Sequence, residues 1–104
     1  MDNRPYHYQI TPLAQQDMDE IFDYISFALS SPQASERLID KIQAAVEQIC
    51  EFPFSRPLLN DAVLRDKGYR LLVIDNYNLF YIVKPETVVV IRVLYGRRDY
   101  GRLL

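Results

Sequence analysis

Hydrophobic and polar side chains alternate from Tyr6 to Ile10, and the pattern then changes to a helical one. Strict alternation is the period of a half-buried strand, so this segment is predicted to be a strand. Between Ala14 and Ala28, apolar residues recur every three or four positions, which predicts an amphipathic helix. Thr11 stands where a residue would cap this helix, and Pro12 stands at its first position. The chain is therefore expected to begin with a strand that leads directly into a helix.

The same capping pattern occurs again at Ser31 and Pro32, so a second helix is predicted to start there. Its apolar stripe continues at helical spacing as far as Ile49, and the helix must end by Phe52 because Pro53 follows. The connection between the two helices is very short. Helices joined in this way pack antiparallel, so the pair is expected to form a helical hairpin.

Three later runs are rich in Val, Ile, Leu and Tyr, and they cover Tyr69 to Ile74, Tyr77 to Val83, and Thr87 to Tyr95. Such runs are typical of strands, and the short polar turns between them predict an antiparallel meander. The segment from Pro53 to Gly68 has little periodicity, so we expect a loop there, with one helical turn around Leu58 to Leu64.

These elements predict an α+β fold of order strand, helix, helix, strand, strand, strand. An N-terminal strand precedes an antiparallel helical hairpin that packs on a small antiparallel sheet, and the chain ends in a short tail or helix. With 104 residues, of which 49% are hydrophobic and 25% charged, the chain is expected to form one domain over residues 1–104.

Other features of the composition exclude several classes of protein. No apolar run approaches the ~18 to 20 residues that cross a bilayer, and the N-terminus lacks the apolar stretch of a signal peptide, so a cytoplasmic location away from the membrane is expected. Cys50 is the one cysteine and cannot form an internal disulfide; it is expected to pack in the core. With His7 as the one histidine, no metal site and no cofactor are expected.

The formal net charge of -2 is unevenly distributed along the chain. From Met1 to Leu64 there are four basic and ten acidic residues, which gives -6, whereas from Arg65 to Leu104 there are eight basic and four acidic residues, which gives +4. A mildly acidic total therefore conceals a basic C-terminal part, and the composition alone does not exclude a nucleic-acid partner.

Two arginines interrupt otherwise apolar predicted strands: Arg70 near the start of one and Arg92 near the end of another. A charge in such a position needs a partner or a function, because arginine is rarely buried unpaired. Each could pair with Asp75 or Asp99, extend to water, or bind a ligand. Whether the two arginines share a face of the sheet depends on strand register, which the sequence does not give.

The chain then enters its densest polar segment, which contains Tyr95, Arg97, Arg98 and Tyr100. Arginines bind phosphates bidentately and tyrosines stack on bases, so this combination suits a site for single-stranded RNA. It is equally compatible with a solvated turn and with core tyrosines that reach the surface.

Established catalytic and phosphate-binding motifs are absent from the sequence. Four carboxylates in the first predicted helix are expected to form a solvated surface and no metal site; they are Asp17, Asp19, Glu20 and Asp23.

The order of elements and several short segments resemble the RelE/ParE superfamily of bacterial type II toxin–antitoxin toxins. The resemblance covers nearly the whole chain, and the strongest part of it is the run from Ile91 to Tyr100. The other segments that carry it are 31–38, which open the second helix, Phe52-Pro53, Tyr69-Arg70, and 76–81.

This resemblance implies a toxin that is neutralised by a cognate antitoxin, whose C-terminal segment wraps around it. RelE-like members cut mRNA in the ribosomal A site, whereas ParE-like members inhibit DNA gyrase and are not nucleases. We predict a ribosome-dependent mRNA endoribonuclease, with ribosome and mRNA as partners and a ParE-like gyrase inhibitor as the alternative. A binding module that has lost its toxicity is a third hypothesis. In all three, an acidic and apolar antitoxin segment is expected over the basic sheet face and tail.

For the nuclease hypothesis, the resemblance carries over to Arg70 and Arg92 as the arginines of the sheet, with Tyr95 and Tyr100 beside them. These arginines, together with Arg97 or Arg98, would stabilise the charge that develops on phosphorus-bound oxygens when the ribose 2′-hydroxyl attacks. Tyr95 or Tyr100 would stack on the substrate or exchange a proton with it.

Overall fold

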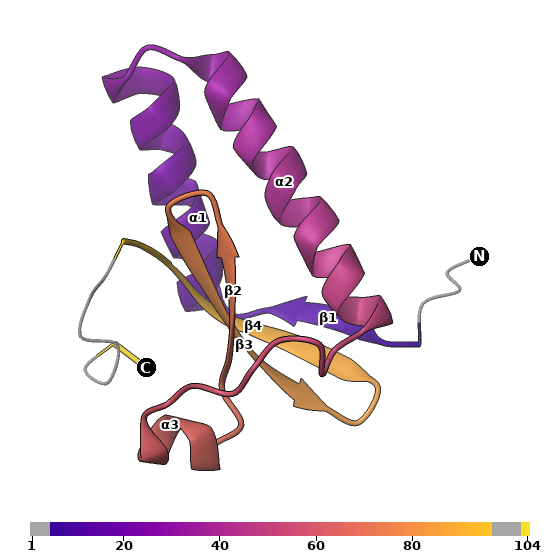
Figure 1. The fold of residues 1–104 in the computed structure, drawn as a ribbon. Coiled ribbons are helices and arrows are strands. Elements are labelled where there is room, and N and C mark those ends of the chain that lie inside the picture. Colours follow the sequence, from indigo (N-terminus) through magenta and orange to yellow (C-terminus); the bar gives the residue numbers. More distant parts are fainter. Residues whose placement is uncertain (1–4, 97–102) are drawn as a thin grey trace.

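Two long helices lie against one face of a four-stranded sheet and project beyond it (Figure 1). The structure is a computed structural model and describes residues 5–96 and 103–104. It confirms the predicted α+β fold. In chain order the elements are β1 (His7–Ile10), α1 (Pro12–Asp23), a π-helical turn η1 (Tyr24–Ala28), α2 (Pro32–Glu51), α3 (Ala62–Asp66), β2 (Arg70–Ile74), β3 (Tyr77–Lys84) and β4 (Thr87–Tyr95).

The strands are ordered β1-β4-β3-β2 in the sheet. Strands β2, β3 and β4 form the antiparallel meander that the turns predict, whereas β1 lies parallel to β4, so the sheet is mixed and not purely antiparallel. A parallel pair needs a long crossover, and the helices and two intervening strands supply it. Strand β1 pairs only with Thr87–Val90, which leaves the second half of β4 without a neighbouring strand on that side.

Both helix starts are where the sequence predicts them. The Thr11 hydroxyl accepts a hydrogen bond from the Ala14 N–H (3.1 Å) and donates one to the Ile91 carbonyl (2.8 Å), so it joins α1 to β4. The Ser31 hydroxyl caps α2 by accepting a hydrogen bond from the Ala34 N–H at 3.4 Å. The predicted helical turn around 58–64 is displaced toward the C-terminus and becomes α3, because the Asp61 carboxylate caps the N–H of Leu64.

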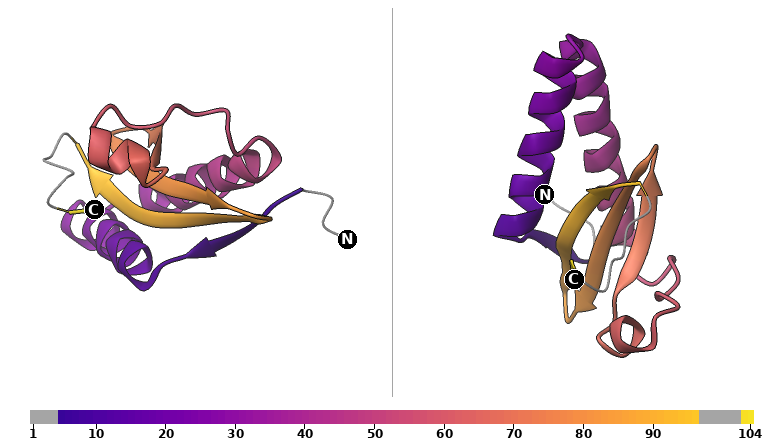
Figure 2. Two further views of the ribbon diagram at one scale, coloured as in Figure 1. Left: turned by 90° about the horizontal axis from the view of Figure 1, so that it is seen from below. Right: turned by 90° about the vertical axis from the view of Figure 1, so that its left-hand side faces the viewer.

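The main core lies between the helical hairpin and the sheet, and Cys50 is fully buried in it, as predicted. A smaller buried set, which includes Phe80, lies outside this cluster. Figure 2 shows α3 on the opposite side of the sheet from α1. The main core consists of Ala14, Met18, Ile25, Leu38, Ile42, Val46, Ile49, Cys50, Leu72, Ile74, Leu79, Tyr81, Val88, Val90 and Val93.

Candidate functional site

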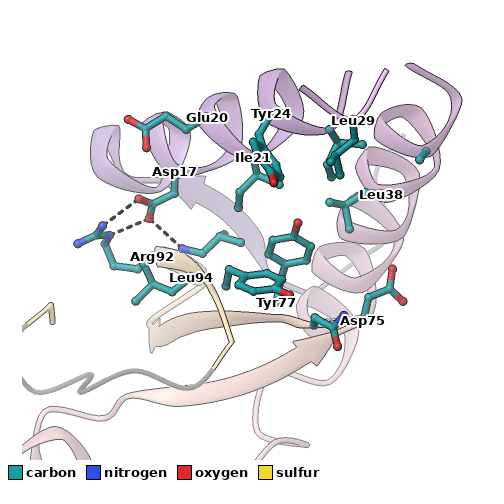
Figure 3. A pocket seen from close by; sticks show the side chains of 15 residues that line it. Asp17, Glu20, Ile21, Tyr24, Leu29, Leu38, Asp75, Tyr77, Arg92 and Leu94 are labelled. Atoms are coloured by element: carbon teal, nitrogen blue, oxygen red, sulfur yellow. Dashed lines mark hydrogen bonds and ion pairs between the residues drawn. The ribbon is translucent and has the colours of Figure 1, made fainter. Parts of the chain in front are cut away.

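Arg92 forms a bidentate ion pair with Asp17 of α1 (Figure 3). Its Nε lies 2.7 Å from Asp17 Oδ2 and its Nη2 lies 2.8 Å from Asp17 Oδ1. The two side chains are only 16% and 11% exposed, so water screens their interaction weakly. The hydrogen bond that Arg92 donates to Asp17 raises the pKa of Arg92, and burial opposes this increase. The guanidinium therefore remains charged and is held against α1.

Asp17 also accepts a hydrogen bond from the backbone N–H of Val93, at 3.0 Å. This N–H lies in the part of β4 that has no neighbouring strand on the β1 side, because β1 pairs only as far as Val90. Thr11 and the first turns of α1 take the place of that strand. Thr11 donates hydrogen bonds to the carbonyls of Val90 and Ile91, and Asp17 accepts one from the N–H of Val93. A carboxylate at a strand edge also blocks pairing with a foreign strand.

One expectation about these charges is wrong, and one of the alternatives left open for Arg92 does not occur. Asp17 is not part of a solvated surface, because its side chain is largely buried and accepts three hydrogen bonds. Asp75 is not the partner of Arg92, because it pairs with Lys41 of α2 at 3.0 Å. Asp99, the other predicted partner, lies outside the described residues. Arg92 donates instead to the carbonyl of Leu103, at 3.1 Å.

Arg70 begins β2 and lies against the loop that follows α2. Its Nη1 donates to the carbonyl of Arg56, and its guanidinium lies over the Phe54 ring, 5.1 Å from the centroid. Beside it in the sheet, the Tyr81 hydroxyl donates to the carbonyl of Pro53 at 3.0 Å. Burial raises the pKa of Tyr81, although the positive charge of Arg70 opposes this effect. Arg70 is thus held by a carbonyl and an aromatic ring.

Strand register places Arg70 and Arg92 on opposite faces of the sheet. Arg70 pairs with Tyr81, whereas Arg92 pairs with Phe80, the preceding residue of β3. Side chains of paired residues share a face and successive residues alternate, so the two arginines point away from each other. A bulge beside Ile91 sets this relation, because it shifts the pairing of β3 with β4 by one residue.

A groove of about 810 Å³ lies between the hairpin and the ends of β3 and β4 (Figure 3). Tyr95 lines it and is in edge contact with Tyr77, with 5.3 Å between the ring centroids. Burial, followed by the charges that neighbouring Tyr95 and Tyr24 would carry, raises the pKa of Tyr77, so this phenol stays protonated at neutral pH. The groove is lined by Asp17, Glu20, Ile21, Tyr24, Ile25, Leu29, Ala34, Leu38, Asp75, Asn76, Tyr77, Arg92, Val93, Leu94 and Tyr95.

Comparison with known proteins identifies the family. The family described as "ParE toxin of type II toxin-antitoxin system, parDE" matches residues 8–100, which is nearly the whole chain. The chain belongs to the ParE toxin family. The predicted superfamily membership is confirmed, and the matching family is the ParE branch.

Two solved structures share the ParE fold of this chain. A structure described as the chromosomal ParDE toxin–antitoxin system from P. aeruginosa matches with a TM-score of 0.72 and 16% identity, over 91% of this chain and 100% of that chain. The toxin–antitoxin complex RelBE2 from Mycobacterium tuberculosis matches with a TM-score of 0.61 and 19% identity, over 88% of this chain and 98% of that chain. At these identities the likeness shows the fold alone. No curated protein sequence matches significantly.

In this ParE-family chain, the described members of the predicted site do not form one cluster. Tyr95 and Arg70 lie on the hairpin side of the sheet, but their partners in β3, Tyr77 and Tyr81, are four positions apart, which corresponds to about 13 Å. Arg92 starts from the other face, but its side chain reaches Asp17 of α1 and lines the same groove as Tyr95. The remaining predicted residues, Arg97, Arg98 and Tyr100, lie outside the described residues.

Asp17 is the site residue that sequence reasoning missed. Its one signal was its helix position, three residues after Ala14 on the apolar stripe, where a charge is out of place. In the part of the chain that the structure describes, no three His, Cys, Asp or Glu side chains are grouped to hold a metal ion. None of the described helices is both long and apolar enough to span a membrane.

Proposed function

We propose that this protein is a ParE-type toxin that inhibits DNA gyrase and does not cut mRNA. The observation that carries the proposal is the match of residues 8–100 to the ParE toxin family, whose members are gyrase inhibitors according to the resemblance set out above. This was the alternative to the nuclease hypothesis.

The arrangement of the sheet arginines supports this choice. A nuclease that lacks a catalytic histidine depends on several cations that converge on one phosphate. Here Arg92 is paired with Asp17, Arg70 is bound to the Arg56 carbonyl and the Phe54 ring, and the two point to opposite faces of the sheet. Using either one on RNA would first require its present contacts to break.

We further propose that a cognate antitoxin binds the basic part of the chain. Both similar structures are described as toxin–antitoxin systems or complexes. The charge of +4 from Arg65 to Leu104 favours an acidic antitoxin segment.

A supercoiling assay with purified DNA gyrase and relaxed plasmid tests the proposal directly. The wild-type protein should inhibit the reaction, and Arg70→Ala should inhibit it equally, since Arg70 has no role in this activity. Circular dichroism checks that the variant is folded. In parallel, primer extension on mRNA from cells after brief induction should show no new cleavage at codon boundaries.

The opposite pair of results would contradict the proposal. Codon-register cleavage that disappears in Arg70→Ala, together with unaffected supercoiling, would establish the nuclease hypothesis instead. Normal growth on expression without antitoxin, with neither activity present, would indicate a binding module that has lost its toxicity.

A further inference from the structure

Three exposed hydrophobic side chains form the tip of the helical hairpin. Tyr24, Phe27 and Leu29 are 59%, 78% and 56% exposed, and Phe27 is the most exposed large hydrophobic residue in the described part of the chain. The hairpin carries this tip away from the sheet (Figure 1). Exposed hydrophobic residues at a projecting point are typical of a protein-binding surface. We call these three residues the hairpin tip.

Backbone hydrogen bonds close the turn that forms the hairpin tip. The π-helical turn η1 ends α1, with the Leu29 N–H bound to the Tyr24 carbonyl at 3.1 Å. Ser30 adopts a left-handed φ of 51°, and the Ser31 N–H binds the carbonyl of Ile25 at 3.1 Å. Ser31 then caps α2. A preformed surface loses little conformational entropy when it binds, and π-helical turns are frequent at functional sites.

The surroundings of the hairpin tip are acidic. Four exposed acidic residues and one basic residue lie between positions 19 and 37, which gives a local charge of -3. The acidic residues, which we call the acidic rim, are Asp19, Glu20, Asp23 and Glu36, and the basic one is Arg37. The best partner for this surface has an apolar pocket with a basic rim.

We infer that the hairpin tip is the surface by which the toxin docks on its target, DNA gyrase. The inference rests on the proposed function. An enzyme that handles DNA must present basic surface to the phosphate backbone, which fits the acidic rim of the tip. Charge argues against the other occupants: an acidic antitoxin segment would be repelled, and so would the equally acidic tip of a second copy. Target and antitoxin would then use oppositely charged ends of the molecule.

The variant Phe27→Ser tests the hairpin tip, because Phe27, unlike Tyr24 and Leu29, does not line the groove between the hairpin and the ends of β3 and β4. Phe52→Ser is the matched control: Phe52 is 61% exposed and lies at the other end of α2. In the supercoiling assay, the concentration of Phe27→Ser that inhibits half of the gyrase activity should rise at least about tenfold, as expected for an aromatic hot spot. Phe52→Ser should match the wild type.

A second variant tests the acidic rim independently of the apolar tip. Asp23→Asn combined with Glu36→Gln removes two charges without changing side-chain size. Inhibition by this variant should weaken several-fold at low salt, and it should depend less on salt concentration than inhibition by the wild type.

Three results would overturn the inference while the proposed function stands. One is that Phe27→Ser inhibits gyrase as well as the wild type. Another is that it loses affinity for the antitoxin encoded beside the toxin, measured with the purified pair. The third is that the wild type self-associates in analytical ultracentrifugation and Phe27→Ser does not. If the wild type leaves gyrase unaffected, the proposed function and the inference both fail.

Discussion

Asp17 shows how much one residue contributes to this fold. Its carboxylate binds both donors of the Arg92 fork and the backbone N–H of Val93, so it joins α1 to a strand edge that would otherwise be open. The hydrogen bond between Asp17 and Arg92 spans 75 positions of the sequence. Local patterns cannot reveal a contact at that separation. The sequence showed that Arg92 needs a partner, and the structure was required to identify it.

The substitution Asp17→Asn should destabilise the protein by about 2–4 kcal/mol, because it leaves the largely buried guanidinium of Arg92 without a counter-charge. Urea denaturation followed by circular dichroism measures this change. The matched control is Asp75→Asn, which removes the ion pair between Asp75 and Lys41; these side chains are half-exposed, so the loss should stay below about 1 kcal/mol. Equal losses of unfolding free energy in the two variants would show that burial does not strengthen the ion pair between Asp17 and Arg92.

Tyr81 makes the stability sensitive to alkaline pH. Burial raises the pKa of Tyr81 in the folded protein above its ordinary value of 10.0. As the pH rises past about 10, the unfolded chain therefore loses this proton before the folded protein does, and the free energy of unfolding falls. Below pH 10 this contribution to stability is fully present.

The variant Tyr81→Phe cannot lose that proton, so its stability should fall less between pH 8 and pH 10.5 than that of the wild type. At pH 8 it should be about 1 kcal/mol less stable, because the hydrogen bond to the Pro53 carbonyl is lost. Urea denaturation at the two pH values gives both quantities. A parallel decline of the two proteins would contradict the role of Tyr81.

At the level of elements, local chemistry determines what the sequence reveals. Proline after a capping hydroxyl predicted both helix starts, and tight polar turns predicted the meander. The parallel pairing of β1 with β4 was not predictable, because alternation in Tyr6 to Ile10 gives a strand but no neighbour or direction. The bulge that places Arg70 and Arg92 on opposite faces left no signal either, since the residues on both sides of Ile91 are compatible with a regular strand.

Thr11 and Ser31 occupy equivalent capping positions, but their loss should have unequal effects. Thr11 accepts a hydrogen bond from Ala14 and donates one to the Ile91 carbonyl of β4, whereas Ser31 makes one longer capping bond, at 3.4 Å. Thr11→Val should therefore cost about 1–2 kcal/mol, and Ser31→Ala less than about 1 kcal/mol. Thermal or urea denaturation of the two variants tests the order, and a larger loss for Ser31→Ala would contradict it.

The separation of charge is a property of the whole molecule. The acidic part of the chain includes β1, the hairpin and the following loop, whereas the basic part contains the meander and the C-terminal segment. Such a division allows two partners of opposite charge to be recognised at different places on a small protein. The net charge of -2 conceals it, and only the distribution along the chain revealed it.

Two double variants test whether the partners are separated in this way. Arg97→Gln with Arg98→Gln removes two positive charges from the basic part, and Asp23→Asn with Glu36→Gln removes two negative charges from the acidic rim. Affinity for the cognate antitoxin, measured by titration calorimetry at 50 and 300 mM salt, should fall about tenfold at low salt for the arginine variant, with a smaller salt dependence. The acidic-rim variant should bind the antitoxin as the wild type does, because its charges lie at the other partner's surface. Equal losses of antitoxin affinity in both variants would show that one partner covers both parts, and the division of surfaces would then be wrong.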